Sequence, residues 1–307
     1  MILRILIFVL EKVLRFLPWR LVVAAGALLG AGAYVVQSRR RRRALANLTT
    51  AFGSTKSPAE LRRLARGLFL HIGRNLAEIV WVAARPQRCD RLVTFEGLEN
   101  LESARSRGRG VVLISGHAGS WELMAAAIVR HGLPLSVIAR RTSQEEISQF
   151  VLRVRERLGV QTILRGSSAA ARTVLRTLRA GDGLASLLDQ DVRVKGVVVD
   201  FFGRPALTPT GPISLALRAG SPLVYFITWR LPDGTHRVRF DPPIEMERDG
   251  DTAATVERNT AAFTLWLEER IREHPDQWMW IHRRWRRGAR RRAKAEREQD
   301  DMARAGN

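Results

Sequence analysis

Residues 111–129 read VVLISGHAGSWELMAAAIV, and this stretch indicates a buried strand that turns directly into a helix. Its first four residues are all apolar and branched, a run typical of a strand that is covered on both faces. Gly119 and Ser120 then suit the entry to a helix through residues 121–129. His117 therefore follows the carboxyl end of a strand, which is where open α/β sheets bind their ligands.

The polar residues of this turn suggest acid–base chemistry. Glu122 comes five residues after His117, a spacing that would not put both on one face of a straight helix, although they can meet across a strand-to-helix turn. A carboxylate that accepts one imidazole N–H fixes the tautomer and leaves the other nitrogen to take a proton from a hydroxyl. We expect His117 and Glu122 to be the catalytic residues. A histidine that only caps the helix is the alternative, and the sequence has no G-x-S-x-G run to support an acyl-serine route.

Strand-like and helix-like segments alternate on both sides of this turn. Helix-type segments such as 143–158 and 169–180 separate most of the β-rich runs, and Ser57, Pro58 and Glu60 form a capping box that starts an earlier long helix. Such alternation predicts an α/β fold with a mostly parallel central sheet flanked by helices. We expect one catalytic domain over residues 44–285, whose β-rich runs are 111–114, 135–138, 184–188, 197–202 and 223–228.

The first 43 residues predict a membrane-anchoring segment. Residues 1–17 mix charged and apolar side chains, as in an amphipathic surface helix, and residues 21–36 carry no charge. The latter run is slightly shorter than the roughly 20 residues of a bilayer span, so it either crosses the membrane or lies in it. Five arginines at 39–43 follow it, which opposes export as a signal peptide and favours the cytoplasmic side. The basic end, residues 286–307, is expected to be a flexible tail.

Composition points to an anionic partner. The 307 residues include 51 Lys and Arg against 30 Asp and Glu, a formal net charge of +21. Anionic lipid, an acidic protein and nucleic acid all remain possible partners on charge alone. The single cysteine, Cys89, excludes an internal disulfide and makes a cysteine-based zinc site improbable.

Three blocks of sequence carry a family resemblance. The first is the H-x4-E run from His117 to Glu122; the second is DQD at 189–191 followed by VDFFGRPALTPTGP at 199–212; the third is HPDQWMWIHRRW at 274–285. Together with the apolar N-terminal segment, they resemble the lipid A biosynthesis (lauroyl/myristoyl) acyltransferases of the lysophospholipid acyltransferase superfamily. The resemblance covers most of the chain.

The resemblance implies transfer of a fatty acyl group from an acyl carrier protein thioester to a hydroxyl of a glycolipid of the lipid A precursor type. It implies His117 as general base supported by Glu122, no cofactor, and a place on the cytoplasmic face of a bacterial inner membrane, in contact with anionic lipid. The expected partners do not include nucleic acid. Further substrate contacts are expected from Arg140, Asp189, Asp191, Arg204 and Arg283.

Two features keep alternatives open. Residues 139–143 read ARRTS, where the lipid A branch usually has Arg-Pro followed by Asn-Pro, so another lysolipid or glycolipid acceptor remains possible. Asp189 and Asp191 form a D-x-D pair, which in many glycosyltransferases binds a metal ion and a nucleotide sugar. A membrane-associated glycosyltransferase is therefore the competing enzyme class. Tryptophans among the arginines of 278–287 suit single-stranded nucleic acid or a membrane interface, and the apolar N-terminal segment favours the membrane. His71, His131 and His236 receive no role.

Overall fold

The computed structural model describes residues 16–140, 145–167, 169–246 and 252–292, together with Val13 and Arg297. The amphipathic helix expected at residues 1–17 falls almost entirely outside these ranges. Of the tail expected at residues 286–307, residues 286–292 are described and are helical, and most of the remainder lies outside the described ranges.

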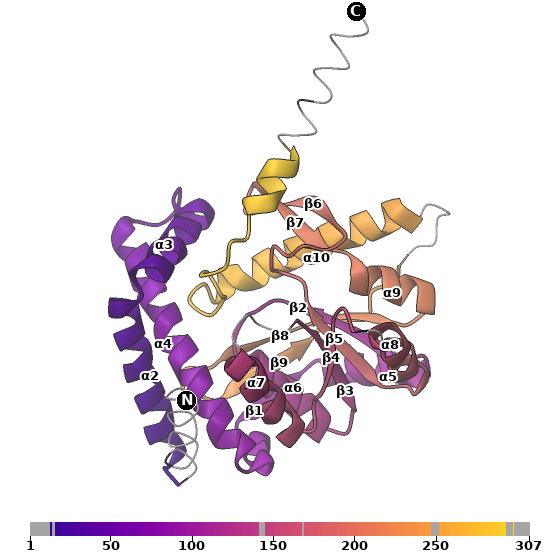
Figure 1. The fold of residues 1–307 in the computed structure, drawn as a ribbon, viewed down its shortest axis with the longest axis horizontal. Helices are drawn as coiled ribbons and strands as arrows, with labels where there is room; N and C mark the ends of the chain where they lie inside the picture. The colour runs from indigo at the N-terminus through magenta and orange to yellow at the C-terminus, as the bar shows by residue number, and fades with distance from the viewer. Residues whose placement is uncertain are drawn as a thin grey trace, which may run out of the picture.

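A seven-stranded sheet forms the centre of the molecule (Figure 1). Its order is β1-β9-β8-β2-β5-β3-β4, and every neighbouring pair is parallel except β8 with β9. The predicted α/β class with a mostly parallel sheet is confirmed. The strands are β1 (Val93–Glu96), β2 (Val111–Ser115), β3 (Leu135–Ala139), β4 (Gln161–Leu164), β5 (Gly183–Leu187), β8 (Leu223–Arg230) and β9 (His236–Phe240).

Two hydrophobic cores lie on opposite faces of this sheet, because successive side chains of a strand point to opposite sides. In β2, Val112 and Ile114 belong to one core, whereas Val111 and Leu113 belong to the other. The first core is closed mainly by α4 (Pro58–Ala83), α9 (Gly211–Ala219) and α10 (Thr252–Glu273), and the second mainly by η1 (Pro86–Arg91), α5 (Leu98–Ser106), α6 (Trp121–Arg130) and α7 (Glu145–Arg157). The remaining interstrand helix is α8 (Ala170–Arg179).

The start of α4 matches the sequence prediction. Ser57 accepts a hydrogen bond from the Glu60 backbone, and the Glu60 carboxylate accepts one from the Ser57 backbone. Pro58 occupies the first helical turn, where its missing N–H leaves no bond unmade. Pro212 lies in the same way in the first turn of α9.

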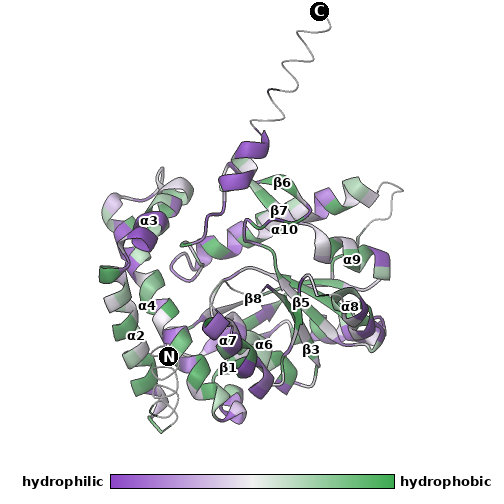
Figure 2. Ribbon diagram, in the orientation of Figure 1, coloured by the Kyte–Doolittle hydropathy of each residue, from purple (hydrophilic) through white to green (hydrophobic). Residues whose placement is uncertain are grey.

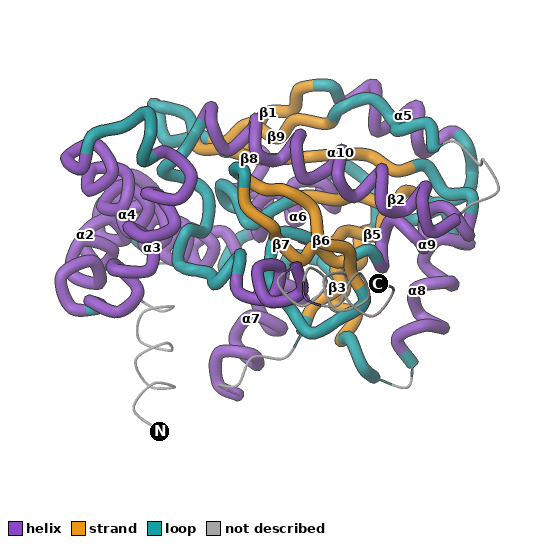
Figure 3. Tube along the Cα trace, turned by 90° about the horizontal axis from the view of Figure 1, so that it is seen from above, coloured by secondary structure: helices purple, strands orange, loops and turns teal. Residues whose placement is uncertain are grey.

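One predicted strand belongs to a different sheet. Residues 197–202 do form a strand, β6 (Gly196–Phe201), but it pairs antiparallel with β7 (Arg204–Pro209) in a separate two-stranded sheet beside α10 (Figure 3). Strand β7 contains Pro205 and Pro209, although prolines are more typical of loops. Each of its prolines lies in a ribbon with one partner strand, where a missing N–H is tolerated. The tight turn is confined to Phe202 and Gly203, which both have positive φ.

The apolar N-terminal helix packs against the following helices. Helix α2 (Trp19–Val36) lies along α4, and α3 (Ser38–Phe52) follows it; all three are grouped at one side of the sheet (Figure 1 and Figure 3). Side chains at Gly26, Gly30 or Gly73 would collide with the facing backbone, so the two helices approach as closely as small residues allow. Helix α3 crosses residue 43, the boundary expected between anchor and catalytic domain.

The outer face of α2 is hydrophobic and exposed (Figure 2). By length and composition this helix could cross a membrane, with a mean hydropathy of 1.6 over its 18 residues. Only 17% of it is buried inside the protein. Its exposed large apolar side chains are Leu21, Leu28, Leu29, Val35 and Val36.

Candidate active site

The pairing of β2 with β5 brings His117 and Asp189 together. The two strands are parallel neighbours in register, with Ser115 opposite Leu187, and each polar residue follows its strand end by two positions. His117 Nδ1 lies 2.6 Å from Asp189 Oδ1, and the His117 backbone N–H donates to Asp189 Oδ2 at 2.7 Å. The carboxylate that contacts the imidazole therefore comes from the neighbouring strand.

Asp189 is fully buried behind the histidine. Burial alone would raise its pKa, but the charge of His117 and the hydrogen bonds from its ring and backbone outweigh burial and hold the pKa well below the usual range. The Trp278 indole N–H donates to the same carboxylate at 2.7 Å. With every one of these neighbours donating, Asp189 is an ionised acceptor that orients the His117 ring with Nδ1 protonated.

The second nitrogen of His117 faces a cluster of polar groups. The amide nitrogen of Gln190 lies 3.0 Å from His117 Nε2 and 3.0 Å from His282 Nε2. Burial and the charge of His117 lower the pKa of His282 to about 4, so this second ring is neutral at pH 7 and accepts the Gln190 N–H. The Trp121 ring packs edge-on against His117, at 5.2 Å between centroids.

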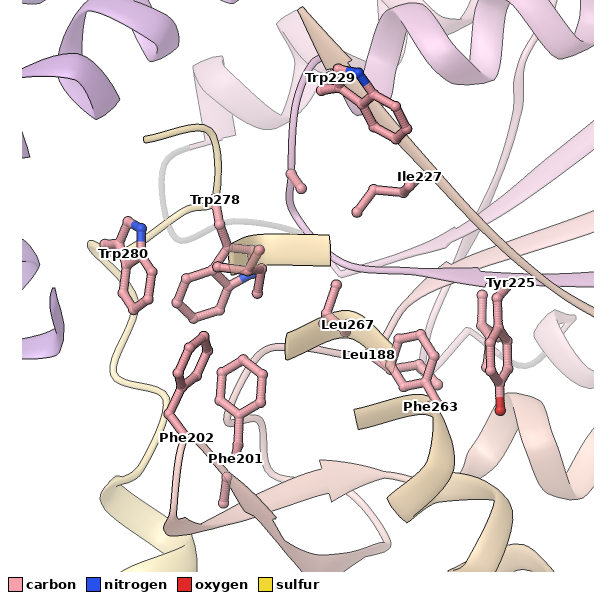
Figure 4. Packing of buried hydrophobic residues seen from close by; sticks show 14 of the residues in the cluster. Leu188, Phe201, Phe202, Tyr225, Ile227, Trp229, Phe263, Leu267, Trp278 and Trp280 are labelled. Atoms are coloured by element: carbon pink, nitrogen blue, oxygen red, sulfur yellow. The ribbon is translucent and has the colours of Figure 1, made fainter. Parts of the chain in front are cut away.

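The backbone of the loop that carries His117 is held by hydrogen bonds with residues 277–279, which belong to the third sequence block. Gly119 N–H donates to Gln277 O at 3.0 Å, and Met279 N–H donates to His117 O at 3.0 Å. Gly119 has φ +57, and a Cβ there would collide with Thr228 O, so glycine is required at this position. Trp278 itself packs among aromatic and aliphatic side chains, beside Phe201 (Figure 4). The loop is thus held rigidly before any substrate binds.

A large pocket of about 1130 Å³ opens at His117. Its walls are mostly apolar, and they run from α6 across β3 and β4 to α7, α8 and α9. Basic side chains, among them Arg140, Arg165 and Lys195, line it as well. A pocket of this size and character suits a long hydrocarbon chain with an anionic group at one end.

A model of the bacterial lipid A biosynthesis acyltransferases matches residues 2–287. The chain belongs to that family.

Individual relatives differ in the lipid that their names specify. A phosphatidylinositol mannoside acyltransferase of Mycobacterium tuberculosis is 30% identical over 65% of this chain, although the match spans only 61% of that relative's length. The corresponding protein of Mycolicibacterium smegmatis is 27% identical over 87% of this chain and 88% of its own. A lipid A biosynthesis lauroyltransferase of Escherichia coli is 26% identical over 88% of this chain and 87% of its own.

Glu122, expected to bond His117, has a different partner in the structure. Its carboxylate accepts two hydrogen bonds from Arg155, at 2.8 and 2.6 Å, and one from the Trp121 indole at 3.2 Å. Among the hydrogen bonds of the described residues, none joins Glu122 to His117. Both residues nevertheless line the same pocket. The histidine of the family motif and its glutamate thus share a site without sharing a proton contact.

The other residues predicted to contact substrate are spread over three places. Arg140 is exposed and lines the pocket. Asp191 is bonded to the side chain and backbone of Arg287, with its carboxylate 2.9 Å from the Arg287 guanidinium. Arg204 and Arg283 are exposed and lie outside the set of residues that line this pocket. Because Asp189 and Asp191 bind separate partners, the D-x-D motif does not present two converging carboxylates.

Gln190 and His282 were missed by sequence reasoning, although both fall inside the blocks that carried the resemblance. The residues next to Gln190 and His282 in sequence give no indication of a role for either side chain. Asp189 was expected at the site, but as a substrate contact. Among the residues that the structure describes, no group of three or more His, Cys, Asp or Glu is arranged to hold a metal ion.

Proposed function

We propose that this protein transfers a fatty acyl group from an acyl carrier protein thioester to a hydroxyl of a membrane glycolipid, with His117 as the general base. The observation that carries the proposal is the contact between His117 and buried Asp189 at the mouth of a large apolar pocket, in a chain of the lipid A acyltransferase family.

The proposed reaction follows from the two nitrogens of the His117 ring. Nδ1–H is bonded to the Asp189 carboxylate, so Nε2 is free to take the proton of an acceptor hydroxyl that displaces the Gln190 contact. The hydroxyl oxygen then attacks the thioester carbonyl; a C–O bond forms, the C–S bond breaks, and the proton passes from the imidazolium to the leaving thiolate. Asp189 stabilises the transient imidazolium.

The positive charge of the protein supports an acidic acyl donor. The chain carries a formal net charge of +21, and basic side chains line the pocket that would take the acyl chain. Complementary charge accelerates the encounter with an acidic carrier protein. The acceptor is a glycolipid of the lipid A precursor type, and a phosphatidylinositol mannoside is the second candidate because the two mycobacterial relatives described above are named phosphatidylinositol mannoside acyltransferases.

The direct test combines purified protein with acyl carrier protein thioesters or acyl-coenzyme A, and with a lipid A precursor or a phosphatidylinositol mannoside as acceptor. We expect the carrier thioester to be preferred and His117→Ala to lower kcat by about 10³-fold, since a positioned base contributes on this order. Unimpaired turnover by folded His117→Ala would refute the mechanism. Equal use of coenzyme A thioesters would refute the donor.

We further propose attachment to the cytoplasmic face of a bacterial inner membrane. The exposed apolar side of α2 and the arginines at the start of α3 support it, because apolar side chains enter the acyl region while arginines meet anionic headgroups. Flotation with vesicles tests this: binding is expected to weaken when anionic lipid is omitted, and indifference to lipid charge would contradict it.

A further inference from the structure

Helix α7 forms one wall of the pocket and packs on α4 and β4, with most of its residues only partly buried or exposed. Of its 13 residues, only Ser148 and Val154 are buried. Ser148, Val151 and Leu152 face the pocket. A contact between α7 and another wall of the pocket would fix the distance between the two walls.

Glu122 and Arg155 supply such a contact. Glu122 lies in the first turn of α6, directly after Trp121, and Arg155 lies in the last turn of α7. Their bidentate ion pair spans 2.8 and 2.6 Å, and the two side chains are only 20% and 14% exposed. A bidentate pair that is shielded from water fixes both distance and orientation, unlike an exposed pair.

We propose that Glu122 is a positioning residue that acts through Arg155: the ion pair holds α7 at the distance from His117 that admits the acyl chain, and so determines which chains are accepted. This inference rests on the proposed acyl transfer. It assigns the glutamate of the H-x4-E run a task separate from proton transfer, because the carboxylate on the His117 ring is that of Asp189.

The prediction concerns acyl selectivity rather than the proton path. Glu122→Gln and Arg155→Gln should each raise KM for the preferred acyl thioester by about tenfold and flatten the preference among chain lengths, in the same direction. The double variant should be no worse than either single variant, because both remove one contact. Arg155→Lys keeps the positive charge but cannot form the bidentate pair, so its effect on KM should be intermediate.

The decisive experiment compares these variants with Asp189→Asn across thioesters of 10 to about 18 carbons, recording kcat, KM and the pH profile of kcat. Asp189→Asn should lower kcat and displace the profile, whereas the Glu122 and Arg155 variants should leave the profile in place. If Glu122→Gln instead displaces the profile while Arg155→Gln leaves KM unchanged, the glutamate belongs to the proton path and the proposal is overturned.

Binding of dansyl-undecanoic acid, followed by fluorescence, separates this inference from the proposed function. Weaker binding in Glu122→Gln and Arg155→Gln, with unfolding temperature close to that of the unchanged protein, supports the positioning role even if no acyl transfer is found. Unchanged probe binding in both variants overturns it. If Glu122→Gln does not fold, Arg155→Lys gives the same two outcomes.

Discussion

The contacts His117–Asp189 and His236–Glu78 are nearly equal in length, 2.6 and 2.7 Å, yet they lie in opposite surroundings. His117 is 19% exposed and faces the pocket, whereas His236 is 1% exposed. In the second pair, Arg230 binds both oxygens of Glu78, at 3.1 and 2.7 Å. A histidine on a carboxylate is therefore suited to act as a base only when its far nitrogen opens onto substrate space and no arginine neutralises the carboxylate.

The far nitrogens of the two rings show this difference directly. His117 Nε2 meets the Gln190 amide at the pocket, while Nδ1 of His236 is buried without a hydrogen-bond partner among the described residues. Burial lowers the pKa of His236, and the hydrogen bond and charge of Glu78 only partly oppose this. Burial would raise the pKa of Glu78, but the hydrogen bonds and charges of His236 and Arg230 lower it to about 2. The first contact faces the pocket, as the proposed proton transfer requires, whereas the second lies inside the fold.

The buried contact also reaches toward the active site. Arg230 donates to Asn75 Oδ1 at 2.9 Å, and Asn75 donates to the backbone oxygen of Gly119 at 2.8 Å. On its other side, the Trp19 indole of α2 donates to Glu78 at 2.7 Å. A polar chain thus runs from the apolar N-terminal helix to the loop that carries His117.

The largest expected effect is on kcat, through the His117–Asp189 contact that faces the pocket. In the unchanged protein, His117 Nδ1–H donates to Asp189. In Asp189→Asn, an amide N–H faces Nδ1 instead, so the His117 ring is driven to the tautomer that is protonated at Nε2. We expect kcat to fall by about 10³- to 10⁴-fold. Steady-state assays check it, with Asp191→Asn as the matched control, because that carboxylate binds Arg287 and its loss should appear mainly in thermal unfolding. Equal kcat losses in both variants would remove the distinction.

Breaking the buried contacts of Glu78 should instead lower the free energy of unfolding. Glu78→Gln leaves the Arg230 charge enclosed without its anion, which typically costs about 3–5 kcal/mol of unfolding free energy. Denaturant unfolding measures this. Asp90→Asn, which breaks the exposed pair with Arg130, should cost less than about 1 kcal/mol. If the two variants lost similar stability, Glu78 would not be the structural anion that its burial indicates.

Acid should weaken the fold through buried neutral histidines. Burial, helped by the charge of Arg230, lowers the pKa of His71 to about 3. The unfolded chain binds a proton near pH 6.5 and the folded chain does not, so stability falls as pH drops below 6.5, by about 1.4 kcal/mol per unit for each such histidine. Unfolding at pH 7 to 5 tests this, and His71→Gln should flatten the slope. A pH-independent unfolding free energy would contradict it.

The smallest expected effect lies at the outer end of the buried network. Trp19→Phe keeps an aromatic ring but removes the N–H that donates to Glu78, which should cost about 1.5 kcal/mol because the acceptor is charged. Trp81→Phe removes a bond to the neutral backbone oxygen of Leu17 and should cost about 1 kcal/mol or less. A larger loss for Trp81→Phe would show that packing, rather than the charge of the acceptor, decides both.

Much of the architecture could be predicted from sequence because it rests on local patterns. The run at 111–114 and the capping box at Ser57 specify a strand and a helix start within a few residues. Strands β1, β4 and β9 were not predicted, since they are short and only partly buried. Strand β7 was hidden by Pro205 and Pro209, which are signals of loops until the partner strand is known.

The site shows where sequence reasoning ends. His117 was found because it lies next to a strand end, but its carboxylate comes from Asp189, 72 residues away. That contact depends on β2 and β5 being neighbours in the sheet, and no local sequence pattern predicts which strands pair. Glu78, His71 and His236 were likewise given no role, because their partners are distant in the chain and only burial reveals them.

The close fit of α2 on α4 has a practical consequence for producing the protein. Removing the apolar helix is a common way to obtain a water-soluble enzyme, but here Gly26 and Gly30 lie in backbone contact with α4. Its removal would uncover Ala77 and Val80 of α4 and leave Glu78 without the Trp19 indole. Purification is therefore better served by detergent or a lipid disc around Leu28 and Val36 than by truncation.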